Sequence, residues 1–145
     1  MAPTIETVAV IGTGVVGRSW ARVFSRAGCC TRLYDGDPAQ VAAALDWLEA
    51  CAAAEVAEGL TTPEEAAASR ARLSGHGDLA EAVAGAGYVQ ESSREQLALR
   101  RPLFAALERA ADPAAILASS PSALDMTAIA ADLATAARCV VAHPV

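Results

Sequence analysis

The sequence has little positive charge and no long apolar run. Its 11 Lys and Arg residues against 17 Asp and Glu residues give a formal net charge of −6. Because nucleic-acid binding needs a basic face that gathers phosphates, we expect no nucleic-acid partner. The apolar runs fall far short of the roughly 20 residues that a transmembrane helix needs, and the first residues lack a signal-peptide pattern. We therefore expect no membrane partner.

Cysteine is scarce as well, with four residues in 145. Cys29, Cys30, Cys51 and Cys139 form no C-x-x-C pair and no spaced Cys/His set. The sequence therefore indicates neither a zinc site nor a disulfide framework, and we expect no bound metal. Buried or half-buried thiols in a reducing compartment are the simplest interpretation, and the cytoplasm is therefore the expected location.

The sequence does contain a regular alternation of strand and helix patterns. The Val- and Ile-rich run at residues 5–11 is typical of a strand buried on both faces. Helix patterns open with capping signals and end at glycines, and the alanine-rich helices are expected to pack closely on a sheet. The other strands are predicted at residues 30–35, 71–75, 88–92, 114–120 and 138–145, and the helices at 15–28, 37–59, 61–71, 78–85, 94–111 and 123–134. This alternation predicts βαβ units and a mostly parallel sheet.

Three glycines, Gly12-x-Gly14-x-x-Gly17, follow the first predicted strand and open the first predicted helix. The pattern alone is weak, but this position is the one that a dinucleotide-binding loop needs. The first glycine permits a tight turn, the second lets a pyrophosphate approach the backbone, and the third lets helix and strand pack closely. The helix N-terminus, with Val15 and Val16, offers free N–H groups to the phosphates.

An acidic residue, Asp35, ends the second predicted strand, 18 residues beyond Gly17. This interval suits the carboxylate that holds the adenosine ribose hydroxyls, which favours NAD over NADP. Two alternatives stay open, a solvated turn residue and the acid that ends the second strand of a methyltransferase. With strand, glycines and acid all placed, we expect residues 1–145 to form one Rossmann-type, doubly wound α/β domain with strand order 3-2-1-4-5-6.

Four segments together resemble the NAD-binding domain of the 3-hydroxyacyl-CoA dehydrogenase family. They are VAVIGTGVVGRSWA, YVQESSREQLALRRPLFAALE, ILASSPSAL and CVVAHPV, and they span essentially the whole chain. GRSWA and VAHPV are most similar to the lambda-crystallin branch of that family. The resemblance implies NAD as cofactor and hydride transfer from a secondary 3-hydroxyl group.

The resemblance also implies roles for particular residues. His143 matches the family's general base, and Ser122, 21 residues earlier, matches the serine that contacts the reacting oxygen and the cofactor. Glu95 and Arg100 match a glutamate and a basic residue beside the nicotinamide half of NAD, although the basic residue is usually Lys. Simpler alternatives are a solvated histidine at a strand end, a helix-capping serine and exposed helix charges. His76 matches no catalytic position and is expected in a loop.

The family pattern continues beyond the last residues of this chain. One expects Asn-Pro, then a glutamate that orients the histidine, then a helical domain that closes the substrate cleft and forms a homodimer. We therefore expect a cofactor domain that ends after its sixth strand, as a fragment, a partial reading frame or a piece of a split enzyme. The substrate is left open between an acyl-CoA, gulonate and carnitine. The alternative function is a non-catalytic NAD-binding module, either a redox sensor or a crystallin-like structural protein.

Overall fold

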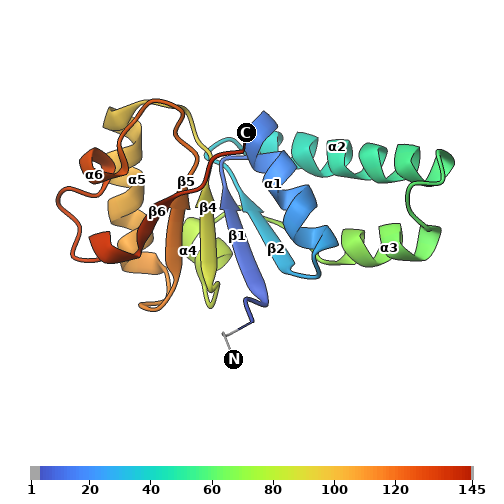
Figure 1. The fold of residues 1–145 in the computed structure, drawn as a ribbon, viewed down its shortest axis with the longest axis horizontal. Helices are drawn as coiled ribbons and strands as arrows, with labels where there is room; N and C mark the ends of the chain where they lie inside the picture. Colours follow the sequence, from blue (N-terminus) through green and yellow to red (C-terminus); the bar gives the residue numbers. More distant parts are fainter. Residues whose placement is uncertain (1–3, 145) are drawn as a thin grey trace.

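The computed structural model describes residues 4–144. Six strands form one sheet in the order β3-β2-β1-β4-β5-β6, and every neighbouring pair is parallel (Figure 1). The strands are β1 (Thr7–Ile11), β2 (Cys30–Tyr34), β3 (Leu73–His76), β4 (Tyr88–Glu91), β5 (Ile116–Ser119) and β6 (Cys139–Val141). The predicted doubly wound fold and its strand order are confirmed. The order reverses between β1 and β4, where such sheets bind their ligands.

Helices cover both faces of the sheet, as the alternation of side chains along β1 requires. Val8 and Val10 belong to one buried cluster, whereas Ala9 and Ile11 belong to the other. The helices on the first side are α1 (Val15–Arg26), α2 (Pro38–Ala57) and α3 (Pro63–Ala71), and those on the second side are α4 (Leu79–Val83), α5 (Leu97–Ala110) and α6 (Met126–Ile129). Because successive strand residues point to opposite faces, one apolar run supplies both cores.

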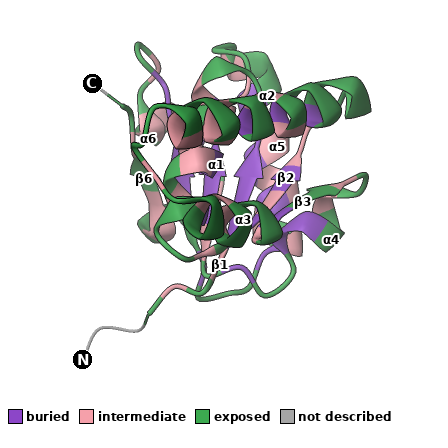
Figure 2. Cartoon of the chain, turned by 90° about the vertical axis from the view of Figure 1, so that its right-hand side faces the viewer, coloured by how far each residue is buried: buried purple, intermediate pink, exposed green. Residues whose placement is uncertain are grey.

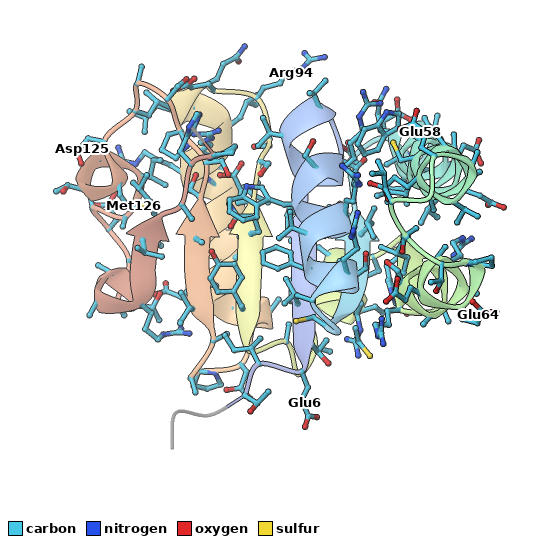
Figure 3. All side chains as sticks on the ribbon, turned by 45° about the vertical axis from the view of Figure 1, so that its right-hand side comes forward. Glu6, Glu58, Glu64, Arg94, Asp125 and Met126 are labelled. Atoms are coloured by element: carbon cyan, nitrogen blue, oxygen red, sulfur yellow. The ribbon has the colours of Figure 1, made fainter. Side chains whose placement is uncertain are left out.

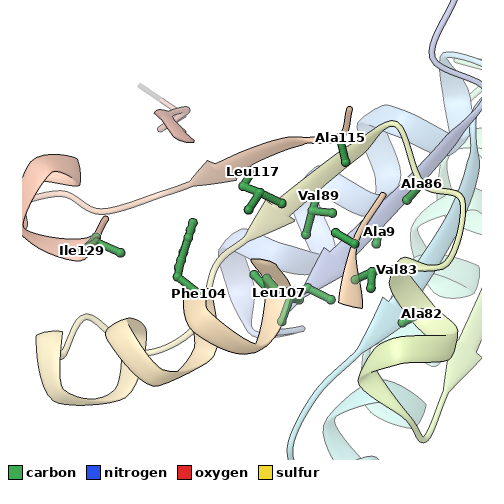
Figure 4. Close-up of a cluster of buried hydrophobic side chains, with 12 residues drawn as sticks. Ala9, Ala82, Val83, Ala86, Val89, Phe104, Leu107, Ala115, Leu117 and Ile129 are labelled. Atoms are coloured by element: carbon green, nitrogen blue, oxygen red, sulfur yellow. The ribbon is translucent and has the colours of Figure 1, made fainter. Parts of the chain in front are cut away.

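The second core is built around α5 (Figure 4). Phe104 and Leu107 are fully buried and pack with Val89 and Leu117 of the central strands. Burying each of these side chains contributes about 1.5–3 kcal/mol relative to leaving it in water. This packing holds β4 and β5 in register, so it also places the loops that follow them.

The alanine-rich helix α2 packs on the sheet only over its first half. Its buried residues are Val41, Ala44 and Leu48, and the remainder is largely exposed (Figure 2). The second half runs beside α3, which begins at a capping box formed by Thr62 and Glu65. The expectation of close packing on the sheet is therefore correct for half of the helix. Within residues 4–144, no helix is both long and apolar enough to cross a membrane.

The third strand ends one residue later than predicted. It runs over Leu73–His76, so His76 closes a strand and does not lie in a loop. Its ring Nε2 lies 3.0 Å from the Ser74 hydroxyl, two residues back on the same face of the strand. The prediction of a loop histidine is wrong, because the strand extends through the glycine at position 75.

The predicted helix at residues 123–134 is mostly replaced by turns. Asp125 accepts from the N–H of Thr127, and helix α6 begins only at Met126 and covers four residues. Further on, Asp132 pairs with Arg101 of α5, and the N–H of Thr135 donates to Glu108. These contacts tie the segment to α5, and a single 3-10 turn, η1 (Ala136–Arg138), then leads into β6.

Candidate functional site

The glycine motif, which runs from the loop after β1 into the first turn of α1, requires glycine at two of its three positions. Gly12 has a φ of +87°, and a Cβ there would lie 2.7 Å from the backbone N of Ser93. A Cβ at Gly17 would lie 1.7 Å from the carbonyl oxygen of Gly12. Among the described residues, a Cβ at Gly14 would meet nothing within 4 Å, so the backbone there faces open space. Tight turn, open approach and close packing are the three features that a dinucleotide loop combines.

The N-terminus of α1 presents unused backbone donors beside this loop. Gly14 is the N-cap, it supplies no capping side chain, and the first turn holds no acidic residue. The first helical bond is donated by the N–H of Arg18, to the carbonyl oxygen of Gly14 at 2.9 Å. The N–H groups of Val15, Val16 and Gly17 therefore have no acceptor within the helix. Together with the helix dipole they suit a pyrophosphate, so the loop fits a dinucleotide such as NAD.

Asp35 follows β2 and holds the glycine loop from the other side. One carboxylate oxygen accepts from the N–H of Thr13 at 2.8 Å and from its hydroxyl at 3.2 Å. The other accepts from the N–H of Asp37 at 3.0 Å. A carboxylate offers about four acceptor positions, so Asp35 can hold this loop and still accept from a ribose hydroxyl. Its role toward the ribose stays a prediction.

Glu95 and Ser122 lie on different loops, after β4 and β5, and the fold brings them together. The Ser122 hydroxyl donates to Glu95, which also accepts from the N–H groups of Ala123 and Leu124. These bonds, the one from Ser122 first, lower the pKa of Glu95 to about 2. Glu95 is therefore ionised at neutral pH, and it joins the two loops at an exposed position. These two site residues, predicted separately, are thus in direct contact.

Arg100 lies beneath the loop after β4 instead of at its surface. Its side chain is 2% exposed, and its Nη2 donates to the carbonyl oxygen of Ser93 at 2.9 Å. Its Nε is 3.4 Å from a carboxylate oxygen of the fully buried Glu91, which also accepts from Ser93 and Ser119. In this arrangement the guanidinium supports the loop that carries Glu95. The predicted contact of Arg100 with the nicotinamide half of NAD stays a prediction.

His143 follows β6 and is exposed. Within residues 4–144 no side-chain hydrogen bond to its ring is present, and Ser122 contacts Glu95 instead of this ring. The structure therefore joins Ser122 to Glu95 but does not join either of them to His143. All three belong to segments that leave the carboxyl ends of strands, at one edge of the sheet. In Figure 3, Arg94 marks this edge and Glu6, before β1, marks the opposite one.

Sequence reasoning missed the polar residues inside the buried strands. Gln90 and Glu91 in β4, with Ser119 in β5 and Ser120 after it, are all buried and hydrogen-bonded. The available signal was their position in otherwise apolar strand runs, because a polar group buried there needs a partner. The bonds that join the two strands, Gln90 to Ser120 and Ser119 to Glu91, link residues about 30 positions apart in the sequence, which a strand pattern does not reveal.

The described residues offer no second candidate site that includes the predicted residues or a metal-binding cluster. A hollow of about 720 Å³ lies between α1, α2 and α3. It is lined by alanines and by charged side chains such as Arg22 and Glu55, which pair with each other, and by none of the predicted site residues. In the described part of the chain, no group of three or more His, Cys, Asp or Glu side chains could hold a metal ion.

The fold and this edge define a dinucleotide-binding Rossmann domain. Residues 7–145 match the family model described as 3-hydroxyacyl-CoA dehydrogenase, NAD binding domain. The chain belongs to this family, as the resemblance predicted, and NAD is the cofactor that its domain binds.

Curated relatives and solved structures agree with this assignment. The lambda-crystallin homolog of Bos taurus is 45% identical over 139 residues, covering 95% of this chain and 43% of the relative. The L-carnitine dehydrogenase of Streptomyces griseus is 40% identical over 140 residues, covering 97% of this chain and 41% of the relative. The crystal structure of 3-hydroxybutyryl-CoA dehydrogenase from Escherichia coli K12 has a TM-score of 0.93 and 30% identity, covering 97% of this chain and 30% of that one. The chain thus spans less than half the length of these relatives.

Proposed function

We propose that this domain serves an NAD-dependent dehydrogenase that oxidises the 3-hydroxyl group of a small hydroxy acid or of its CoA thioester. One observation carries the proposal. The dinucleotide loop, the Glu95–Ser122 pair and the exposed His143 all lie at the carboxyl edge of one parallel sheet. This is the edge at which α/β sheets collect ligands and catalytic groups.

Oxidation of a secondary alcohol removes a proton from oxygen and a hydride from the carbon that bears it. In the proposal the imidazole of His143 takes the proton, which it can do near neutral pH. In the structure Ser122 donates its proton to the ionised Glu95. To hold the substrate oxygen while His143 takes the proton, this hydroxyl would turn from Glu95 and donate to that oxygen. NAD, when bound, supplies the carbon that accepts the hydride.

The substrate class follows from the relatives by analogy only. Their names point to carnitine and to 3-hydroxybutyryl-CoA, and the lambda-crystallin branch adds L-gulonate as a third candidate. All three carry a hydroxyl group at the third carbon, which is the group the proposed reaction needs. We also propose that the intact protein is a cytoplasmic homodimer, which light scattering and cell fractionation would test.

The deciding experiment measures NADH absorbance with the protein made from its complete reading frame. The substrates are L-gulonate, L-carnitine and 3-hydroxybutyryl-CoA, each with NAD. His143→Gln is expected to reduce kcat about 100- to 10,000-fold, as the loss of a positioned base does. His76→Gln is the matched control, because His76 lies on the edge strand β3 and bonds only to a neighbouring serine in the described residues. It is expected to leave kcat unchanged.

Two outcomes would contradict the proposal in different ways. Turnover that survives His143→Gln would show that another group takes the proton. Tight NAD binding without turnover of any of the three substrates would favour the non-catalytic NAD-binding module. The similarity to a lambda-crystallin homolog is the observation that supports this alternative.

A further inference from the structure

A buried polar cluster lies under the segment that carries His143. Its centre is the hydroxyl of Ser120, a residue that is 7% exposed. Trp20 of α1 donates to this oxygen at 3.2 Å, and Gln90 of β4 donates to it at 2.6 Å. Ser120 in turn donates to the carbonyl oxygen of Ala142 at 2.9 Å. One serine thus joins α1 and β4 to the residue immediately before His143.

The direction of these bonds is determined by the chemistry of the partners. The Tyr88 hydroxyl donates to Oε1 of Gln90 at 2.8 Å, and burial raises the pKa of Tyr88, which keeps this hydroxyl protonated. The carbonyl oxygen of Ala142, 3.2 Å distant, can only accept, so the NH₂ group of Gln90 points at it and at Ser120. Trp20 and this NH₂ group can only donate, so they use the lone pairs of the Ser120 oxygen. The Ser120 proton then has two acceptors within reach, the carbonyl oxygen of Ala142 at 2.9 Å and the hydroxyl of Ser92 at 3.1 Å, and the carbonyl oxygen is the nearer.

The backbone of Ala142 is consequently held at both of its polar groups. Its N–H donates to the carbonyl oxygen of Ser119 at 2.8 Å, and its carbonyl oxygen accepts from Ser120 and Gln90. On the other side of His143 stands Pro144, whose ring restricts the preceding residue to extended conformations. The backbone of His143 is thus constrained from both sides while its ring stays exposed.

We infer that Ser120, oriented by Gln90 and Trp20, is a positioning residue that holds the proposed base, His143, over the carboxyl edge of the sheet. This inference rests on the proposed function and adds to it a group that never touches the substrate. Three features support it: the serine is buried, its hydroxyl accepts from Trp20 and Gln90 on two other elements, and the nearer acceptor for its proton belongs to the segment that carries the base. A serine that served only the packing of β5 would not need to reach across to Ala142.

The test compares two buried serines in the protein made from its complete reading frame. Ser120→Ala removes the hydroxyl under Ala142, whereas Ser25→Ala removes another buried hydroxyl, which among the described residues bonds only to the Arg22 carbonyl of α1 and to Ser69. For Ser120→Ala we expect kcat to fall roughly 10- to 100-fold, as displacements near 1 Å do, with the KM for NAD almost unchanged. For Ser25→Ala we expect a comparable loss in Tm and an unchanged kcat. Trp20→Phe keeps the aromatic ring and removes one donor, so a smaller fall in kcat is expected.

A second measurement does not depend on turnover. In the 145-residue chain, hydrogen exchange at the Ala142 N–H reports how firmly this segment is held. Ser120→Ala should speed this exchange about 10-fold or more, and Ser25→Ala should not. A wild-type kcat and wild-type exchange in Ser120→Ala would overturn the inference, as would a loss of kcat that Ser25→Ala reproduces. Survival of turnover in His143→Gln would instead refute the proposed base and leave the exchange result to decide on Ser120.

Discussion

The close approach of Gly17 to the backbone of Gly12 predicts that a side chain at position 17 destabilises the cofactor loop. In Gly17→Ala the new Cβ would lie 1.7 Å from the carbonyl oxygen of Gly12 and 2.8 Å from its carbonyl carbon. Ordinary contacts are near 3.5 Å, so α1 or the loop must move by roughly 2 Å. Both neighbours are backbone, so no side chain can rotate away. We expect the upper end of the usual cost of overpacking, about 3 kcal/mol, which lowers Tm by roughly 10 °C for a chain of this size.

Gly14→Ala is the matched comparison, because a Cβ there meets nothing within 4 Å. It replaces an N-cap glycine by alanine, which costs at most about 1 kcal/mol, so Tm should fall by only a few degrees. Its methyl group would stand in the space through which a pyrophosphate approaches, so NAD affinity should fall about 10-fold or more. Calorimetry with NAD and thermal unfolding separate the two effects. A Gly17→Ala variant with wild-type Tm and wild-type affinity would refute the packing described for this loop.

Three further predictions concern the remaining site residues. The chain should bind NAD more tightly than NADP in calorimetric titration, because the Asp35 carboxylate repels a 2′-phosphate, and equal affinities would contradict this. The pKa of Glu95 is lowered to about 2, so the ionised side chain should stabilise the chain relative to Glu95→Gln. This difference in the free energy of unfolding should be complete above the ordinary pKa of 4.5 and should disappear as the pH falls to about 2. Urea unfolding of both proteins across that range checks the sign, and a difference that grows in acid would be inconsistent with it. The 145-residue chain should bind NAD yet form no NADH with the three candidate substrates. The reason is that His143 is exposed and its ring has no hydrogen-bonded partner among the described residues. Robust turnover would contradict this prediction.

The elements of the fold were predictable where local chemistry decides them. The Val- and Ile-rich β1, the Asp37–Pro38 start of α2 and the glycines of the first loop are all local signals, and the structure has each of them at the predicted place. The prediction of a helix at 123–134 was wrong because Arg101 and Glu108, both on α5, bind the segment that follows α6, at Asp132 and Thr135. Local propensity contains no information about such tertiary contacts.

The candidate site divides in the same way. The glycine loop and Asp35 were predictable from spacing, and the resemblance to a family pointed to Glu95, Ser122 and His143. The joining of Glu95 to Ser122 was not predictable, because the two residues are 27 positions apart and meet only when β4 and β5 pair. The same holds for Gln90 and Ser120, whose polar character inside buried strands was visible while their common target was not.

The final prediction concerns the buried pair of Glu91 and Arg100, because each charge offsets the desolvation cost of the other. Glu91 is fully buried and Arg100 is 2% exposed, with 3.4 Å between Arg100 Nε and a Glu91 carboxylate oxygen. Two nitrogens of Arg100, Nε and Nη1, are buried without a hydrogen-bond acceptor in the described residues, so the pair is imperfectly satisfied. Removing one partner should nevertheless be costly, because it leaves the other charge unpaired in the interior.

Arg100→Met should therefore destabilise the chain by about 3 kcal/mol, the lower end of the range for breaking a buried pair. The lower end applies because Glu91 keeps its bonds from Ser93 and Ser119. Adding Glu91→Gln to Arg100→Met removes the orphaned charge and should recover most of that loss, because neutral groups cost much less to bury. Urea unfolding of the two single variants and the double variant measures the interaction directly. A double variant whose loss equals the sum of the single losses would show that the two charges act independently.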